Sequence, residues 1–223
     1  DGETIKIANP LSSEFEFLRP TLIINLLKNT GENFRFYDEV KIFELAKVFQ
    51  KGGVGPYEEW RVAGLISKKD KKAHPFLELK GVVEKMFEAF GFWDLEFHDL
   101  KSNAWFLAGR SAEIKTGEES LGFIGEISPS LTQKYNDSYP AVAFEMDLEK
   151  IIKSIKEETE YEPLTKFPAV IRDISLLVGA EIRVSEILNI INDSEKNILR
   201  DVDLFDVYEG EKIGANKKSL SFH

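Results

Sequence analysis

A charged stretch near residue 160 divides this chain into two parts. The segment KSIKEETEYEPLTKFP, residues 153–168, lacks the regular apolar spacing of a helix or a strand and closes with two prolines. We interpret it as the tail of a helix that runs into a linker. The sequence therefore predicts two domains, at residues 1–155 and 167–223, with a linker at residues 156–166.

The composition supports folded domains and excludes several classes of site. Hydrophobic residues make up 43% of the 223 residues, which is too apolar for a disordered acidic chain. The net charge of −10 argues against a broad RNA-binding surface, because Lys and Arg supply most of the affinity for phosphate. A small recognition face remains compatible with this charge.

The residues that are missing from the sequence are also informative. The absence of cysteine excludes disulfides, Cys-ligated zinc and thiol catalysis, and it fits a cytoplasmic protein. No apolar run approaches the roughly 20 residues of a membrane helix, so we expect no membrane partner. No basic segment followed by an apolar stretch indicates a secretory signal.

The first part mixes helices and strands. LRPTLIINLLKNTG is predicted as a helix, with Pro20 in its first turn and Gly31 as a left-handed stop. HPFLELKGVVEKMFEAFG is the strongest helix, ending at Gly91. SPSLTQKYN is a short helix with Ser128 as N-cap and Pro129 in the first turn.

Strand patterns in the first part follow one another closely. VKIFELAKVF and YEEWRVAGLIS alternate with a period of two, and four further candidates are DLEFHDL, FLAGRSAEIKTG, SLGFIGEIS and AVAFEMDLEKI. Links of hairpin length favour an antiparallel sheet. Helices packed on one antiparallel sheet make an α+β domain.

The second part follows the order β-α-β-turn-β. AVIRDISLLV is a strand, VSEILNIIND a helix, DVDLFDVY a second strand, and KKSLSFH begins a third. A split β-α-β-β-α-β module has this order, so we expect a ferredoxin-like domain that lacks a helix and a final strand, about 30 residues. In the second strand, alternation predicts that Phe205 and Val207 are core, and that Val202, Leu204, Asp206 and Tyr208 share the other face.

No self-contained active site is found. There is no phosphate-binding glycine loop and no G-x-S-x-G nucleophile elbow. His74, His98 and His223 share no metal-ligand spacing. GRSAEI, residues 109–114, has no neighbouring His or Lys base. The sequence therefore predicts no catalytic residue and no metal site in this chain, and a binding or scaffold role.

The ordered set of motifs resembles a known family. NPLSSEFEFLRPTLIINLLKN and VKIFELAKVF are similar to the catalytic-like domain of the bacterial phenylalanine–tRNA ligase beta subunit, and LELKGVVEKMFEAFGF, GRSAEI, GFIGEISPSL and AFEMDLEKI continue in that family's order. FPAVIRDISLLV through LFDVYEGEKIGANKKSLSFH resembles its C-terminal ferredoxin-like anticodon-binding domain. The resemblance implies the C-terminal part of a longer beta subunit.

The resemblance also implies why catalytic groups are missing. Class II aminoacyl-tRNA synthetases hold ATP on an antiparallel sheet with arginines, which neutralise phosphate charge. KIFELAKVF offers only Lys41 and Lys47, and AVAFEMDLEKI places Glu145, Asp147 and Glu149 where a phosphate would be repelled. We therefore expect a degenerate class II synthetase-like sheet. In the family, the alpha subunit uses ATP and Mg²⁺, this chain needs no cofactor, and the assembly is an α2β2 heterotetramer.

The resemblance further implies a contact with the anticodon of tRNA(Phe). Asp206, Tyr208 and Ser219 would face the anticodon, and Ser175 borders that surface. A tyrosine at a strand end can stack on an unpaired base, and a carboxylate can accept hydrogen bonds from base amino or imino groups. Two further residues, Lys217 and Lys218, are candidates for contacts with backbone phosphates.

The sequence also leaves two other functions open. Ferredoxin-like domains also bind effectors, so one alternative is a regulatory small-molecule-binding module, which would not depend on anticodon sequence. The other is a free-standing class II ligase, against which the loss of both arginine positions counts. Binding of ATP by residues 1–150 would favour that second alternative.

Overall fold

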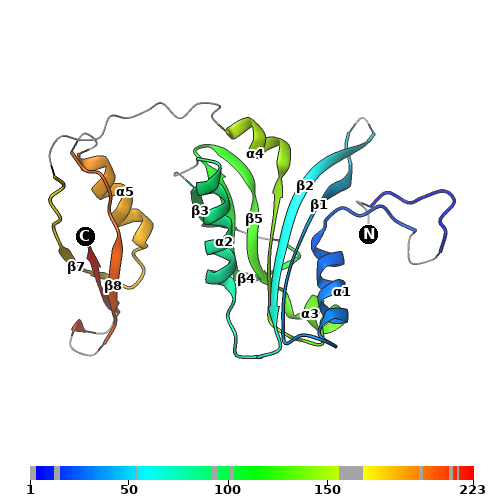
Figure 1. Cartoon of the computed structure of the whole chain (residues 1–223), viewed down its shortest axis with the longest axis horizontal. Coiled ribbons are helices and arrows are strands. Elements are labelled where there is room, and N and C mark those ends of the chain that lie inside the picture. Colours follow the sequence, from blue (N-terminus) through cyan, green and yellow to red (C-terminus); the bar gives the residue numbers. More distant parts are fainter. Residues whose placement is uncertain are drawn as a thin grey trace. The chain divides into compact units, whose positions relative to one another are not determined.

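The chain divides into two units, residues 1–160 and residues 161–223, called here the N-terminal unit and the C-terminal unit (Figure 1). The predicted linker at residues 156–166 lies outside the described residues. The computed structural model describes residues 4–12, 16–53, 55–91, 95–100, 103–155, 168–195, 198–210, 213–214 and 216–223.

The N-terminal unit is built on one antiparallel sheet of six strands in the order β1-β2-β6-β5-β4-β3. Strands β1 and β2 are the longest and form a hairpin, so β1 lies at one edge of the sheet. The strands are β1 (Glu39–Lys51), β2 (Pro56–Lys68), β3 (Leu95–Asp99), β4 (Phe106–Thr116), β5 (Glu119–Ile127) and β6 (Ala141–Asp147).

Helices cover both faces of this sheet, and each face has its own core (Figure 1). On one face α1 (Ile23–Asn33) and α3 (Pro129–Tyr135) pack over β2 and β6. On the other face α2 (Phe76–Ala89) and α4 (Leu148–Ser154) pack over β2, β6 and β5. Among the described residues, this second core includes none from β1.

Two of the four predicted signals at helix ends are confirmed. The position predicted for Pro20, in the first turn of a helix, is wrong, because α1 begins at Ile23. Gly91, at φ +80°, follows the C-cap of α2, and Ser128 precedes Pro129 at the start of α3, as predicted. The stop predicted at Gly31 is wrong, since α1 continues to Asn33. A Cβ at Gly31 would lie 2.3 Å from the carbonyl oxygen of Tyr135. Glycine here allows α1 to approach the end of α3.

The C-terminal unit has a three-stranded antiparallel sheet in the order β7-β9-β8 with one helix. This is the order that the β-α-β-β part of a ferredoxin-like fold produces. Ile187 of the helix packs on Leu220 and Phe222 of the central strand. The elements are β7 (Ile174–Gly179), α5 (Val184–Ser194), β8 (Leu204–Tyr208) and β9 (Lys217–Phe222).

Within the described ranges, none of the helices combines the length and the apolar character that crossing a membrane requires.

Candidate nucleic-acid interface

The C-terminal sheet has one face covered by α5 and one face without a helix among the described residues. Leu220 and Phe222 of β9 point toward α5 and are almost completely buried. Because side chains alternate along a strand, Ser219 and Ser221 point to the opposite face. We call this the open face of the C-terminal unit.

The strand register brings the predicted site residues together on the open face in two rows across the sheet. Ser175 and Asp206 both lie opposite Ser221, and the hydroxyl oxygens of Ser175 and Ser221 are 2.9 Å apart. Tyr208 lies opposite Ser219 in the next row. Side chains directly opposite each other on neighbouring strands are within reach of one another, so the four predicted residues form one surface.

A β-bulge between Leu204 and Asp206 changes the faces predicted for β8. Leu204 and Val202 pack in the core with α5, on the side opposite to Asp206. Phe205 is 52% exposed and Val207 is 50% exposed. The prediction that Phe205 and Val207 form core is wrong. Phe205 lies at the bulge, whose extra residue breaks the period of two. Val207 lies opposite Leu220, on the side of α5, and is half exposed there.

The bulge adds an aromatic pair that the sequence analysis did not identify. The Phe205 ring stacks on the His223 ring, with centroids 5.0 Å apart and planes at 22°. His223 and Asp203 exchange backbone hydrogen bonds of 3.0 and 2.8 Å, which hold this end of the sheet. No local signal in DVDLFDVY marks the bulge, so these residues could not be assigned from alternation.

Tyr208 is supported from the following turn. Its side chain is 43% exposed, and a Cβ at Gly210 would lie 2.6 Å from its hydroxyl oxygen. The phenol therefore lies against Gly210, which the sequence analysis also did not single out.

The two predicted phosphate contacts are placed differently. Lys217 is exposed and lies in the same alternation as Ser219, on the open face. Lys218 lies opposite Val178, on the side that α5 covers, and its Nζ donates to the Ala180 carbonyl oxygen at 2.9 Å. Lys217 is therefore the better placed of the two for a contact on the open face.

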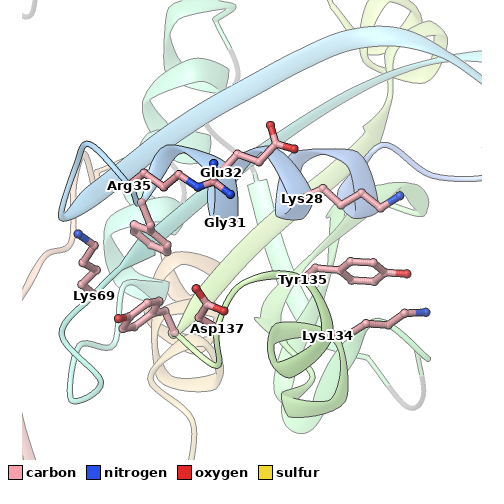
Figure 2. Close-up of a pocket in the computed structure, with 10 residues that line it drawn as sticks. Lys28, Gly31, Glu32, Arg35, Lys69, Lys134, Tyr135 and Asp137 are labelled. Carbon is pink, nitrogen blue, oxygen red and sulfur yellow. The ribbon is translucent and has the colours of Figure 1, made fainter. Parts of the chain in front are cut away.

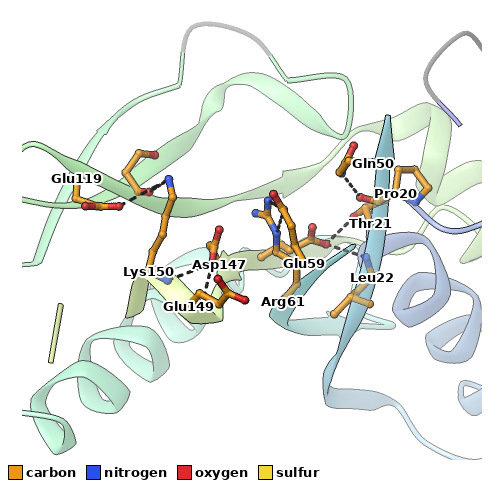
Figure 3. Close-up of polar contacts among 12 residues, drawn as sticks. Pro20, Thr21, Leu22, Gln50, Glu59, Arg61, Glu119, Asp147, Glu149 and Lys150 are labelled. Carbon is orange, nitrogen blue, oxygen red and sulfur yellow. Dashed lines mark hydrogen bonds and ion pairs between the residues drawn. The ribbon is translucent and has the colours of Figure 1, made fainter. Parts of the chain in front are cut away.

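In the N-terminal unit, carboxylates predicted to repel phosphate cap helices instead (Figure 3). Glu145 is 3% exposed and accepts hydrogen bonds from the Thr21 hydroxyl at 2.6 Å and the Leu22 N–H at 2.8 Å, at the start of α1. Asp147 accepts from the N–H groups of Glu149 and Lys150 at the start of α4. Both carboxylates satisfy amide groups that a helix start leaves unpaired.

The cationic side chains of β1 are engaged as well. Lys41 forms ion pairs with Glu39 and Glu78, and Lys47 pairs with Glu58. The residues that the structure describes contain no cluster of three His, Asp or Glu side chains able to hold a metal ion.

Burial raises the pKa of the Glu145 carboxyl above its ordinary value of 4.5, although the bonds from Thr21 and Leu22 act in the opposite direction. The folded state thus favours the protonated form. Its contribution to stability is complete below the unfolded pKa and is lost as pH rises through the folded pKa. We expect the wild-type chain to lose stability relative to Glu145→Gln as the pH rises above 4.5. Urea unfolding of both proteins at pH values below and above 4.5 measures the difference in stability. If the stability of the two proteins depended on pH in the same way, the raised pKa of Glu145 would be contradicted.

The family assignment comes from sequence comparisons. The family described as phenylalanyl tRNA synthetase beta chain CLM domain matches residues 1–148, and the ferredoxin-fold anticodon binding domain matches residues 165–223. Phenylalanine–tRNA ligase beta subunits from Geobacillus kaustophilus and Moorella thermoacetica are 33% and 34% identical over 99% and 98% of this chain. The chain spans only 29% and 28% of the length of these relatives.

A solved structure shares the fold. A pyrrolysyl tRNA synthetase from Desulfitobacterium hafniense superimposes with a TM-score of 0.54 at 19% identity, covering 72% of this chain and 59% of that one. With both family domains present in order, the chain belongs to the family of phenylalanine–tRNA ligase beta subunits.

Proposed function

We propose that this chain recognises the tRNA(Phe) anticodon through the open face of its C-terminal unit, as part of a phenylalanine–tRNA ligase. The observation that carries the proposal is the pair of rows in which Asp206, Tyr208, Ser175 and Ser219 meet on one surface. The match of residues 165–223 to an anticodon binding domain supports it.

Each residue has a definite role in this proposal. The exposed ring of Tyr208 stacks on an unpaired base, and the Asp206 carboxylate accepts from base amino or imino groups. The hydroxyls of Ser219 and Ser175 donate or accept at base edges. Lys217 contacts a backbone phosphate, where a single ammonium acts as a point charge.

The N-terminal unit acts in this proposal as a non-catalytic, class II synthetase-like scaffold for a cytoplasmic ligase. The lysines and carboxylates that stand in place of catalytic groups are ion-paired or bound to helix starts. ATP and Mg²⁺ are then used by the alpha subunit of an α2β2 assembly. The alternative of a regulatory effector-binding module has no support in the comparisons, in which the relatives are tRNA ligase subunits.

An exposed apolar surface supports docking of the alpha subunit. Phe43, Leu45 and Trp60 are 80%, 51% and 41% exposed. They lie on one face of the β1–β2 hairpin, where α2 contacts β1 through the ion pair between Lys41 and Glu78. Phe43 lies opposite Gly64, which has no side chain to shield it. We call these three residues the hairpin apolar face. The relatives are named beta subunits, which implies that they assemble with a different subunit.

Replacing Tyr208 with alanine tests the anticodon role. We expect binding of the tRNA(Phe) anticodon stem-loop to weaken by roughly 1–3 kcal/mol, because one base stack is lost. The measurement is a titration of the full-length chain with labelled stem-loop RNA, with a scrambled loop beside it.

Tyr37→Ala is the matched control, since Tyr37 is 60% exposed in the N-terminal unit. It should leave the affinity unchanged. Equal binding of the scrambled loop, or a silent Tyr208→Ala in a folded protein, would remove the open face from recognition.

A further inference from the structure

A second feature able to bind an anion lies in the N-terminal unit, in a pocket of about 590 Å³ between α1, α3 and the loop after β2 (Figure 2). Its lining includes four cationic side chains and two tyrosines: Lys28, Arg35, Lys69, Lys134, Tyr135 and Tyr139. Two carboxylates, Glu32 and Asp137, also reach it. A local excess of cations is unexpected in a chain of net charge −10.

Among the described residues, three of the four cations that line this pocket lack an ion pair, whereas Lys69 pairs with Asp38 at 2.9 Å. In the same described ranges, Lys28, Arg35 and Lys134 form no ion pair, and neither does Lys71 beside Tyr139. Most other Lys and Arg side chains of the described N-terminal unit do form one, for example Lys6 with Glu16 and Arg110 with Glu126. Unpaired cations therefore gather around one pocket.

Two of them converge on the same ring. The Nζ of Lys134 lies 4.9 Å from the centroid of Tyr135, and that of Lys28 lies 5.5 Å from it. Figure 2 shows Lys28, Tyr135 and Lys134 on one side of the pocket, and Arg35 and Lys69 on the other. Two ammonium groups beside one ring repel each other, and a bound anion would relieve this repulsion.

The frame of the pocket is held firmly. The close approach at Gly31 brings α1 against the carbonyl of Tyr135. Asn136, completely buried, donates from Nδ2 to the Ser67 hydroxyl at 2.9 Å and to the Tyr139 carbonyl at 3.2 Å. Phe34 packs edge-on against Tyr139 with centroids 5.0 Å apart. The tyrosines are thus fixed before any ligand arrives.

We propose that this pocket binds the phosphodiester backbone of RNA, with Lys28 and Lys134 each contacting a phosphate and Arg35 available for a two-pronged contact. The inference rests on the proposed function, since tRNA is the RNA concerned. The cations are spread along an open pocket, which suits successive phosphates better than one small anion. Tyrosine rings between the lysines provide surfaces on which a base or a ribose can lie, a combination typical of RNA-binding grooves.

The test is the salt dependence of tRNA binding by the full-length chain assembled with its partner subunit. For Lys28→Gln together with Lys134→Gln, we expect the slope of log K against log salt to become less steep by about 1.5, since each lost phosphate contact removes about 0.7–0.9. Lys115→Gln together with Lys153→Gln is the matched control, because neither lysine lines the pocket. It should leave the slope unchanged.

The outcomes separate this inference from the anticodon proposal. If the pocket variant flattens the slope while Tyr208→Ala is silent, the pocket binds RNA and the anticodon role fails. If Tyr208→Ala weakens binding while the pocket variant keeps the wild-type slope, the pocket inference is overturned. If the pocket variant no longer assembles with the partner subunit but its salt slope for tRNA binding is unchanged, the pocket receives an acidic protein segment and not RNA. If the wild-type assembly does not bind tRNA, both proposals are overturned.

Discussion

Replacing Gly122 with alanine is expected to destabilise the N-terminal unit by roughly 3 kcal/mol or more, since overpacking and backbone strain each cost about 1–3 kcal/mol. A Cβ at this position would lie 2.2 Å from the Glu145 carbonyl oxygen and 2.7 Å from the Met146 Cα. Both atoms belong to the backbone of β6, which is held between β2 and β5. Neither neighbour can move without breaking the centre of the sheet.

Gly81→Ala provides a control with the opposite sign. Gly81 lies inside α2, and a Cβ there meets no atom within 4 Å. Alanine should therefore raise stability by up to about 1 kcal/mol, the difference in helix propensity. Urea unfolding of Gly122→Ala and Gly81→Ala measures both changes in stability. Equal urea midpoints for the two variants would show that the close contact at Gly122 does not exist in solution.

The second large effect is expected at the hairpin apolar face. Phe43→Asp together with Leu45→Asp should weaken binding of the alpha subunit by about 3–5 kcal/mol, more than about 100-fold in Kd, because unpaired charges would be buried at the interface. Sedimentation of the full-length chain with the alpha subunit measures the change.

Val82→Asp on α2 is the comparison, since Val82 has the same exposure as Leu45, 51%, but lies outside the hairpin. It should assemble normally. Full assembly of the double variant would place the interface elsewhere on the unit.

Strand positions in this chain are predictable because they rest on local alternation. The strand predicted in VKIFELAKVF lies within β1, where Val40 and Val48 are buried and Lys41 is exposed, and the helix predicted up to Gly91 is α2. Such patterns need only neighbours in sequence. The ferredoxin-like order of the C-terminal unit was predictable for the same reason, from one helix and three strand patterns.

Features that depend on distant contacts were not predictable. Glu145 binds the start of α1 across 124 residues of sequence, and Gly31 is needed because Tyr135 lies beside it in space. Likewise, Lys28 and Lys134 come together only after folding. The bulge at Phe205 is a different case, because strand alternation describes an unbroken ladder and cannot indicate an extra residue.

The distance between the two rows of residues on the open face is fixed, and any nucleic-acid strand that contacts both rows must match it. Tyr208 and Asp206 are two residues apart on β8, so their rows are about 6.7 Å apart, given a rise of about 3.3–3.4 Å per residue. Successive stacked nucleotides are only about 3.4 Å apart. Adjacent bases that meet both rows must therefore be separated from each other first, so a loop that stacks its bases firmly would bind less well than a loose one.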